Sequence, residues 1–349
     1  MIRGASPGNT PVPFCRKAEL AAELHGPVGV RLGRVSTPGG NLGRDPQVET
    51  TGAPAGYGQV MGDTQVMTLP DGRELAWLEK GKARGAPVFV FHGTPGTRLQ
   101  VSFDDKAITA SGVRFIAPDR PGYGHSSFHR GRTLADWATD VATLADHLKI
   151  ERFAVAGVSG GGPHSAVCAA LLPDRVTGAA IVSGVGPMAD PELSAEMVAF
   201  NKAAVVMAAR APFLLVPVFA FQQYFMRRWP DAALRAAARQ FAAPDVELLQ
   251  RPDVRAAFMD DLRQPSATTA QAGAQDFVLF ARDWGFRPQD ISVPVQVWHG
   301  DLDRNVPFAQ GEFMANRIPG AEFHACPGEG HLVVVNHLEE ILKGVSAGS

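Results

Sequence analysis

The chain has 349 residues, of which 45% are hydrophobic and 19% are charged, and its formal net charge at pH 7 is −2. This composition is typical of a globular protein with enough apolar material for a core. Charge this close to neutral gives no electrostatic basis for binding nucleic acid or an anionic membrane, so neither is expected as a partner.

Residues 1–60 are expected to form a disordered or loosely attached arm. They contain 11 glycines and 7 prolines, whereas the other 289 residues contain 26 and 20, and this enrichment disfavours a packed core. Globular patterning begins at Met61, a candidate for the true first residue. The arm lacks the apolar run of a secretory signal. The three cysteines form no C-x-x-C pair, which is typical of free thiols in a reducing compartment, so a cytoplasmic protein is expected.

A hairpin opens the globular part. The strand-like runs 64–69 and 74–79 flank the turn sequence P-D-G-R at 70–73, an arrangement typical of two antiparallel strands. Further along the chain, short apolar runs predict buried strands at residues 88–91, 113–117, 153–156, 179–182 and 293–298.

Helical patterns separate these runs. Thr133 is expected to cap a helix whose apolar residues recur at intervals of three, four and seven as far as Leu148. Strands that alternate with helices form a parallel sheet with helices on both faces. The sequence therefore predicts an α/β fold, a mostly parallel sheet with a leading antiparallel hairpin.

Residues 186–290 interrupt the alternation. They contain helical and Pro-punctuated segments rich in Ala, Phe and Met, and no convincing strand. We expect a helical cap inserted into a core formed by residues 61–185 and 291–349. The most apolar stretch, 205–221, lies in this cap and is interrupted by an arginine and two prolines, so no integral membrane segment is expected there.

A glycine cluster surrounds one serine. Residues 155–163 read V-A-G-V-S-G-G-G-P, which puts Ser159 on a strand-to-helix turn with the pattern G-x-S-x-G. In a nucleophile elbow of this kind, the turn lifts the serine hydroxyl clear of the sheet and aims a helix N-terminus at it. A phosphate-binding loop is rejected because the chain lacks G-K-[ST] and has no acidic residue at the spacing of a dinucleotide site.

The loop H-G-T-P-G at 92–96 follows a predicted strand and resembles an oxyanion loop. Acyl transfer needs two backbone N–H donors aimed at the oxyanion, one from the residue after the nucleophile and one from such a loop. Gly160 and Thr94 are therefore expected to form the oxyanion hole. His92 is expected to hold this loop in place rather than to transfer a proton.

Two later motifs offer an acid and a base. In H-G-D-L-D-R-N-V-P at 299–307, two carboxylates follow a predicted strand; Asp303 is favoured as the residue that orients the histidine, and Asp301 is expected to brace the turn. His331 lies on a Gly-flanked loop before the last helix and is expected to be the general base. The chain order supports a catalytic triad of Ser159, Asp303 and His331.

From about residue 62 to 345 the chain resembles the α/β-hydrolases. The resemblance implies the same triad, a cap at 186–290 and a structural role for Asp119. A serine at position 159 argues against the haloalkane dehalogenases and epoxide hydrolases of this fold, which use aspartate. The motifs that carry the resemblance are H-G-T-P-G at 92–96, D-R-P-G-Y-G-H-S at 119–126, G-V-S-G-G at 157–161, H-G-D-L-D at 299–303 with V-P at 306–307, and G-E-G-H at 328–331.

These features predict a serine hydrolase that cleaves a carboxylic ester of a hydrophobic small molecule through an acyl-enzyme, without a metal ion or organic cofactor. Two other reactions stay open: an aminopeptidase resembling proline iminopeptidases, whose H-G-G-P-G is similar to residues 92–96, and hydrolysis of a C–C bond in a diketone. A non-catalytic ligand-binding protein on the same fold is the alternative from another class. The oligomeric state is not predicted.

Two sets of residues in the expected cap bear on the substrate. The apolar side chains that would favour a hydrophobic group are Phe200, Val205, Met207, Phe213, Leu214, Phe219, Phe221 and Phe225. The carboxylates available to hold a free amine, as proline iminopeptidases require, are Glu192, Glu196, Asp231, Asp245, Glu247, Asp260 and Asp261.

Overall fold

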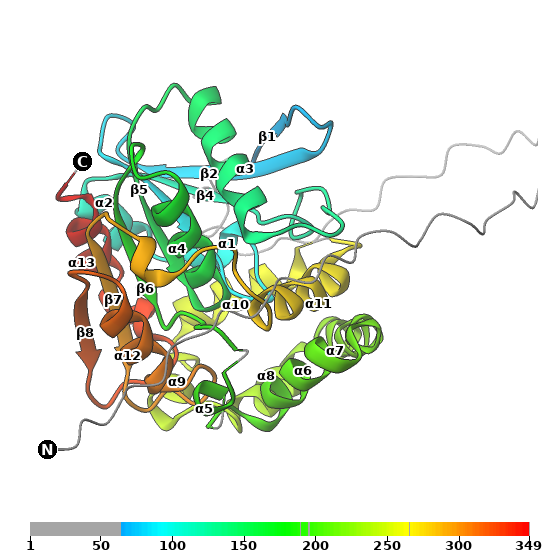
Figure 1. Ribbon diagram of the computed structural model, residues 1–349. Helices are drawn as coiled ribbons and strands as arrows, with labels where there is room; N and C mark the ends of the chain where they lie inside the picture. The colour runs from blue at the N-terminus through cyan, green and yellow to red at the C-terminus, as the bar shows by residue number, and fades with distance from the viewer. Residues whose placement is uncertain (1–63, 189, 195, 265, 349) are drawn as a thin grey trace, which may run out of the picture. The chain divides into compact units, whose positions relative to one another are not determined.

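The computed structural model describes residues 64–188, 190–194, 196–264 and 266–348. The arm expected at residues 1–60 and the candidate first residue Met61 lie outside these ranges. The strands of the described part are β1 Gln65–Thr68, β2 Glu74–Gly81, β3 Pro87–Phe91, β4 Arg114–Pro118, β5 Phe153–Val158, β6 Val176–Val182, β7 Val295–Gly300 and β8 Glu322–Cys326 (Figure 1).

The strands form one mostly parallel sheet in the order β1-β2-β4-β3-β5-β6-β7-β8. β2 is antiparallel to both β1 and β4, and every other neighbouring pair is parallel. The predicted α/β fold with a leading antiparallel hairpin is therefore confirmed. In such a sheet the carboxyl ends of the parallel strands share one edge, so the loops that follow β3, β5 and β7 lie at the same edge.

The edge strand β8 was not among the predicted strands. Its sequence, E-F-H-A-C, is short, and its side chains are mostly exposed or half-buried because only β7 pairs with it. A strand at the edge of a sheet needs neither an apolar run nor a strict alternation, so the sequence carries little signal for it.

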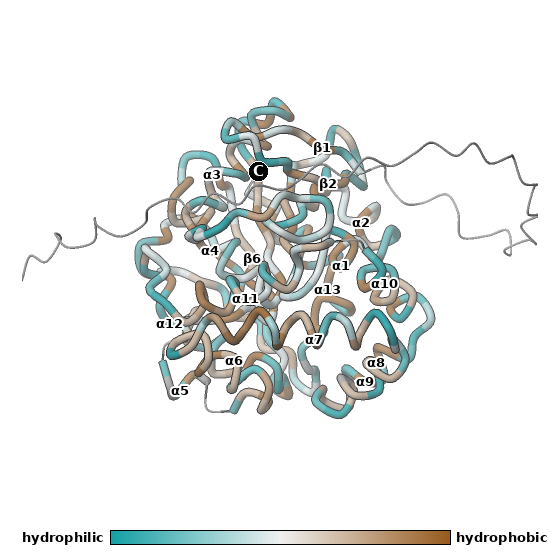
Figure 2. Tube along the Cα trace, turned by 90° about the vertical axis from the view of Figure 1, so that its right-hand side faces the viewer, coloured by the Kyte–Doolittle hydropathy of each residue, from teal (hydrophilic) through white to brown (hydrophobic). Residues whose placement is uncertain are grey.

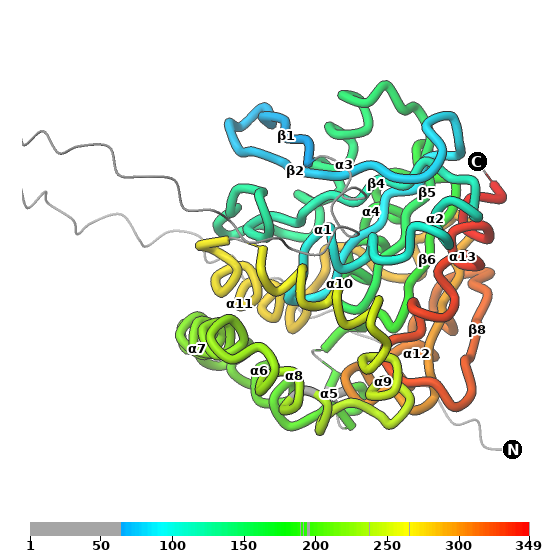
Figure 3. Tube along the Cα trace, turned by 180° about the vertical axis from the view of Figure 1, so that it is seen from behind, coloured from blue at the N-terminus to red at the C-terminus, as the bar shows by residue number. Residues whose placement is uncertain are grey.

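Helices cover both faces of the sheet. One face carries α3 Leu134–His147, α4 Gly162–Leu171 and α12 Phe308–Arg317. The opposite face, seen from behind in Figure 3, carries α1 Arg98–Val101, α2 Asp105–Ser111 and α13 Val333–Ser346.

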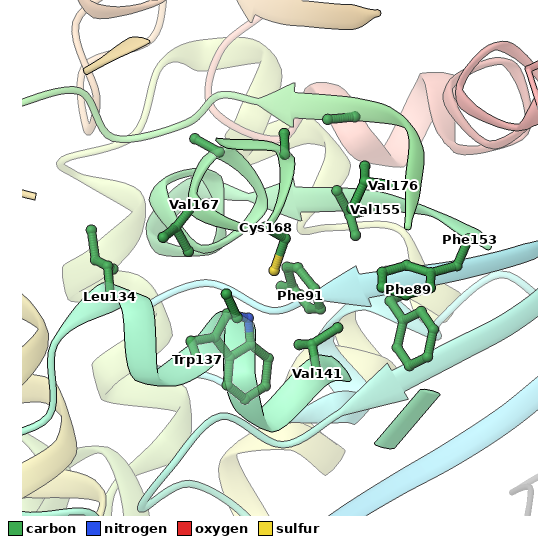
Figure 4. Packing of buried hydrophobic residues seen from close by; sticks show 14 of the residues in the cluster. Phe89, Phe91, Leu134, Trp137, Val141, Phe153, Val155, Val167, Cys168 and Val176 are labelled. Atoms are coloured by element: carbon green, nitrogen blue, oxygen red, sulfur yellow. The ribbon is translucent and has the colours of Figure 1, made fainter. Parts of the chain in front are cut away.

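Alternation along the strands supplies both apolar cores. In β3, Phe89 and Phe91 belong to the core under α3 and α4, whereas Val88 and Val90 belong to the core under α13. Figure 4 shows the first core, where Trp137 of α3 packs near Phe91. The helix predicted after Thr133 is α3, and Thr133 caps it through a capping box.

Between β6 and β7, every regular element of the described residues is helical. Figures 1 and 3 show α10 and α11 between the sheet and an outer group formed by α6, α7 and α8, and α10 contacts α1. No helix in the described ranges has both the length and the apolar character that a membrane crossing requires. These elements are α5 Pro191–Ser194, α6 Ala199–Arg210, η2 Pro212–Leu214, α7 Leu215–Arg228, α8 Pro230–Ala238, α9 Ala243–Leu248, α10 Pro252–Arg263, α11 Thr269–Phe280 and η3 Pro288–Asp290.

Candidate active site

Ser159 lies in a sharp turn between β5 and α4, at the start of a short 3-10 turn. Its φ angle is 54°, in the left-handed region that L-residues rarely adopt. The turn is possible because its neighbours lack side chains: a Cβ on Gly157 would collide with the backbone of Gly161, and one on Gly161 with the carbonyl of Phe91. The glycine cluster in the sequence is therefore explained by close backbone packing around one strained serine.

The loop after β3 lies directly against this turn. A Cβ on Gly93 would be 3.3 Å from the Cβ of Ser159, and a Cβ on Gly160 would be 3.1 Å from the backbone N of Thr94. The Thr94 N–H has no acceptor among the described residues, and Gly160 is the second residue of the 3-10 turn, where N–H groups have no partner within a helix. Both expected oxyanion donors thus lie beside the serine with their N–H groups available.

Asp303 and His331 meet across two loops. His331 Nδ1 is 2.8 Å from Asp303 Oδ2, and the other oxygen of the carboxylate accepts the backbone N–H groups of Asn305 and Val306 at 2.9 and 3.0 Å. The imidazole of His299 also approaches Asp303 Oδ2, at 3.3 Å. The carboxylate is thus buried, and each of its oxygens has a partner.

The pairing of Asp303 with His331 shifts the pKa of both groups. Burial alone would raise the pKa of Asp303, but the nearby His331 charge and the hydrogen bonds from His299 and His331 hold it below its usual range. Burial alone would lower the pKa of His331, but the charge and hydrogen bond of Asp303, with a smaller contribution from Asp245, raise it above its ordinary value. The pair is therefore arranged to stabilise an imidazolium.

The other residues singled out in the sequence have local partners. His92 is fully buried and accepts the backbone N–H of Arg120 at its Nε2, and burial lowers its pKa well below the ordinary value. Asp119 pairs with Arg98 at 2.7 Å inside the turn of residues 119–126. Asp301 accepts the N–H of Gly328 at 2.7 Å, so it braces the loop that carries the histidine.

One buried polar network beside the site was not found from the sequence. Asp276 of α11 accepts hydrogen bonds from the hydroxyl of Thr94 at 2.6 Å and from Arg120 at 2.7 Å, and it pairs with Arg132 as well. Tyr123 donates to the same carboxylate at 2.8 Å. Burial would raise the pKa of Asp276, but the charges of Arg120 and Arg132 hold it below the usual range. α11 is thus tied to the loop of residues 92–96 by a charged group.

Two further aspartates lie in the helical segment, the helices between β6 and β7, and each binds a loop that follows a strand of the sheet. Asp245 of α9 accepts the backbone N–H groups of His331 and Leu332 at 2.9 and 2.8 Å. Asp261 of α10 accepts both the N–H and the hydroxyl of Thr97, at 2.8 and 2.6 Å. Asp245 and Asp261 were named in the sequence only as candidate amine ligands.

A cavity of about 820 Å³ joins these parts. Thr94, Gly160, Ser159 and His331 line it, so the structure brings the serine and the histidine to one cavity, and Asp303 reaches it through His331. Of the eight apolar residues expected to face a substrate, four line the cavity: Phe200, Phe219, Phe221 and Phe225.

The remaining four apolar residues do not line the cavity. Val205 and Met207 pack in the core of the helical segment, and Phe213 and Leu214 are exposed. No cluster of three or more His, Cys, Asp or Glu side chains suited to a metal ion occurs in the described part of the chain.

Comparison with known proteins agrees with the fold. The sequence model of a family described as alpha/beta hydrolase fold matches residues 86–338. The chain is 36% identical over 115 residues to the uncharacterized hydrolase YcgS of Bacillus subtilis, a match that covers 33% of this chain and 39% of that protein. The curated relatives at 35 to 36% identity are matched over less than two-fifths of their length.

Two longer matches have lower identity. A bifunctional esterase/perhydrolase of Acinetobacter calcoaceticus is 24% identical over 290 residues, which cover 80% of this chain and 98% of that protein. The crystal structure of an enol-lactonase from Burkholderia xenovorans LB400 is similar in fold, with a TM-score of 0.57 at 23% identity, over 80% of this chain and 98% of that one.

Proposed function

The chain belongs to the α/β-hydrolase family, and from that premise we propose that it is a serine hydrolase that cleaves a carboxylic ester of a hydrophobic small molecule through an acyl-enzyme. The observation that carries the proposal is the 2.8 Å contact between His331 and Asp303 at a cavity that Ser159 also lines. The match along 98% of an esterase/perhydrolase supports an ester as the bond cleaved.

The proposed cycle uses only this chain's own groups. His331 takes the proton of Ser159 while Asp303 holds the imidazole and stabilises its charged form. The serine oxygen attacks the ester carbonyl, whose oxygen is stabilised by the N–H groups of Thr94 and Gly160. The protonated His331 gives its proton to the leaving alcohol, and a water activated by the same histidine then releases the acid.

We infer that residues 186–290 act as the cap of this site. Phe200, Phe219, Phe225 and Phe277 line the cavity from α6, α7 and α11. Aromatic walls on this side favour an apolar acyl or alcohol group, because burying such a group removes apolar surface from water.

The carboxylates of the cap favour an ester over a peptide with a free amine. Among the described residues that line the cavity, Asp261 is the one carboxyl group. Burial raises its pKa to about 7 in spite of the hydrogen bonds from Thr97, so it is only partly ionised near neutral pH. Asp245 binds the backbone of His331 instead, and the other five candidates are exposed. An amine therefore finds no free carboxylate here.

A nucleophile test separates an enzyme from a binding protein. A fluorophosphonate should label the folded wild-type chain once, at Ser159, and Ser159→Ala should abolish both labelling and hydrolysis of p-nitrophenyl esters. Ser165 is buried in the neighbouring helix, so Ser165→Ala is a matched control that should keep both. An unlabelled wild type would favour the binding protein, and activity in Ser159→Ala would remove the serine from the mechanism.

A substrate series separates the three reactions. A cavity of about 820 Å³ with apolar walls should give kcat/KM that rises with acyl length along a series of nitrophenyl esters. Preference for proline nitroanilide would favour the aminopeptidase, and turnover of a diketone without ester cleavage would favour the C–C hydrolase.

A further inference from the structure

The helical segment exposes an unusual concentration of large apolar side chains. Nine large hydrophobic residues are exposed in the described part of the chain, and six of them lie between residues 206 and 229. Phe213 and Phe221 are the most exposed, at 74% and 72%. Single exposed apolar residues are ordinary, but a cluster indicates a surface that meets something apolar. We call this cluster the aromatic face; it consists of Phe213, Leu214, Phe221, Tyr224 and Trp229.

The aromatic face lies at the entrance of the cavity. It runs along η2 and α7, in the outer group of helices that α10 and α11 separate from the sheet (Figures 1 and 3). Phe221 and Arg227 are exposed and also line the cavity, so the cavity reaches the surface along α7. A molecule that leaves an apolar phase covering this face would enter the cavity directly.

The residues around the aromatic face carry an excess of positive charge, which favours an anionic surface. Residues 199–238 contain five basic side chains and a single acidic one, Asp231, which pairs with Arg255 at 2.5 Å. The charge of −2 for the whole chain conceals this local excess of positive charge. Along α7, hydrophobic stretches are interrupted by hydrophilic positions (Figure 2), and the helix ends in two arginines, Arg227 and Arg228. Arg228 lies over the ring of Trp229, with 5.2 Å from its guanidinium carbon to the ring centre.

Exposed aromatic side chains flanked by arginines are suited to an anionic lipid surface, which has charged headgroups outside and apolar acyl chains beneath them. Aromatic rings partition into the boundary between headgroups and acyl chains, and arginines bind the anionic headgroups. A second copy of the chain fits less well, because a two-fold contact would bring the same arginines toward one another. We propose that the aromatic face docks the protein on anionic lipid, with the cavity entrance toward the lipid.

The docking does not depend on which reaction the protein catalyses. If the protein is the proposed ester hydrolase, a consequence follows from the docking: its substrates are esters dissolved in, or built into, a lipid phase. An ester that partitions into lipid is concentrated there, and the docked cavity opens onto it. The substrate class is then an ester too apolar to reach the enzyme efficiently through water.

Flotation with vesicles tests the docking without interference from hydrolysis. Full-length protein carrying Ser159→Ala is mixed with vesicles of phosphatidylglycerol and phosphatidylcholine in equal parts, or of phosphatidylcholine alone. We expect binding to the anionic vesicles that weakens as salt is added. Phe213→Ser with Tyr224→Ser should lower the partition coefficient by about tenfold or more. Arg210→Gln with Arg228→Gln should lower it by about tenfold and reduce its salt dependence.

The matched control places the same change elsewhere on the surface. Val66 and Leu171 are also exposed, at 50% and 45%, and Val66→Ser with Leu171→Ser should leave vesicle binding unchanged. Equal binding of the aromatic-face variant and the parent would overturn the docking. Absence of vesicle binding would also overturn the docking. If the protein then proved to be a dimer that Phe213→Ser dissociates, the aromatic face would instead be a contact between two copies of the chain.

Activity measured with the native serine separates failure of the docking from failure of the function. Phe213 and Tyr224 do not line the cavity. Their serine variants should therefore keep the parent's kcat/KM on a short water-soluble ester and lose about tenfold or more on an ester embedded in anionic vesicles. Vesicle binding without hydrolysis of either ester would remove the proposed function and leave the docking intact.

Discussion

Ser159 holds a strained backbone that its neighbours maintain. With φ at 54°, the residue adopts a conformation that costs free energy, and only tight packing of the surrounding chain can keep it there. The two glycines at 157 and 161 allow that packing, because a side chain at 157 would collide with the backbone of Gly161 and one at 161 with the carbonyl of Phe91 at the end of β3. The packing thus holds the hydroxyl in place at the cavity before any substrate arrives.

The charge of His331 predicts the pH dependence of turnover. A general base acts in its neutral form, and the pKa of His331 is raised above the ordinary 6.5 by Asp303. The kcat/KM should therefore rise with pH and reach half its plateau above 6.5. A pH profile with nitrophenyl butyrate measures this directly, and a half-maximum below the ordinary histidine value would contradict the assignment.

Removing the Asp303 charge should shift the pH profile of kcat/KM to lower pH. In Asp303→Asn the imidazole loses the group that stabilises its charged form, so its pKa falls and the acid limb shifts to lower pH. The plateau should drop by about 10³–10⁴-fold, because the tautomer and orientation of His331 are lost. Asp301→Asn is the matched control on the same turn, and a similar loss there would show that the acid was wrongly chosen.

The triad candidates could be named from the sequence because each stands in a short pattern: Ser159 and Asp303 follow predicted strands, and His331 lies on a Gly-flanked loop before the last helix. The supporting aspartates could not. Asp245 follows a proline at the start of a helix, where acidic residues are common for local reasons. Asp276 did leave a signal, as the one charged residue of the segment 269–280, but its partners lie 144 to 182 positions away in the chain.

Among the elements, α9 has a direct effect on His331, the proposed base. Asp245 accepts two backbone N–H groups of the histidine loop, and a Cβ on Gly330 would collide with its carboxylate. The short helix α9 thus fixes the loop that carries His331, and the charge of Asp245 also adds to the raised pKa of that histidine.

Asp245→Asn should therefore change the pH profile as well as the rate. The amide can accept one of the two N–H groups but presents a donor to the other, so kcat should fall by about tenfold, the loss expected for one hydrogen bond to a charged group. The acid limb should move to lower pH because a negative charge near His331 is removed. Glu247→Gln, an exposed change on the same helix, should alter neither; a fall in stability with an unshifted profile would mean that Asp245 only supports the fold.

The elements themselves were predictable to different degrees. Strands buried on both sides, such as β5 and β6, are continuous apolar runs that stand out in the sequence. The helix α3 has an apolar face and a capping box, so its start could be named. The outer helices carry weak patterns because one side meets the cavity and the other is exposed, and neither side imposes a regular apolar stripe.

At the scale of the whole molecule, the Asp276 network joins α11 to the loops that follow β3 and β4. Arg120 and Arg132 come from the core, and both are almost fully buried together with the carboxylate of α11. A buried charge without its partner is strongly destabilising, so this network makes the packing of α11 on the core a requirement for stability.

Asp276→Asn should lower the free energy of unfolding by about 3–5 kcal/mol, because it leaves two buried guanidinium groups without a counter-charge. Urea denaturation followed by circular dichroism measures the change. Asp260→Asn removes an exposed carboxylate paired with Arg263 and should cost less than about 1 kcal/mol. A loss of similar size in both variants would contradict the role of burial.

Three carboxylates of a single segment hold two loops of the site: Asp276 and Asp261 bind Thr94 and Thr97 on the loop after β3, and Asp245 binds His331 on the loop after β8. Partial opening of that segment would release His331 and the loop of Thr94 in one event, while the strands remained paired. A denaturation curve that follows only the backbone signal would then report an intact protein at a urea concentration where turnover has already stopped.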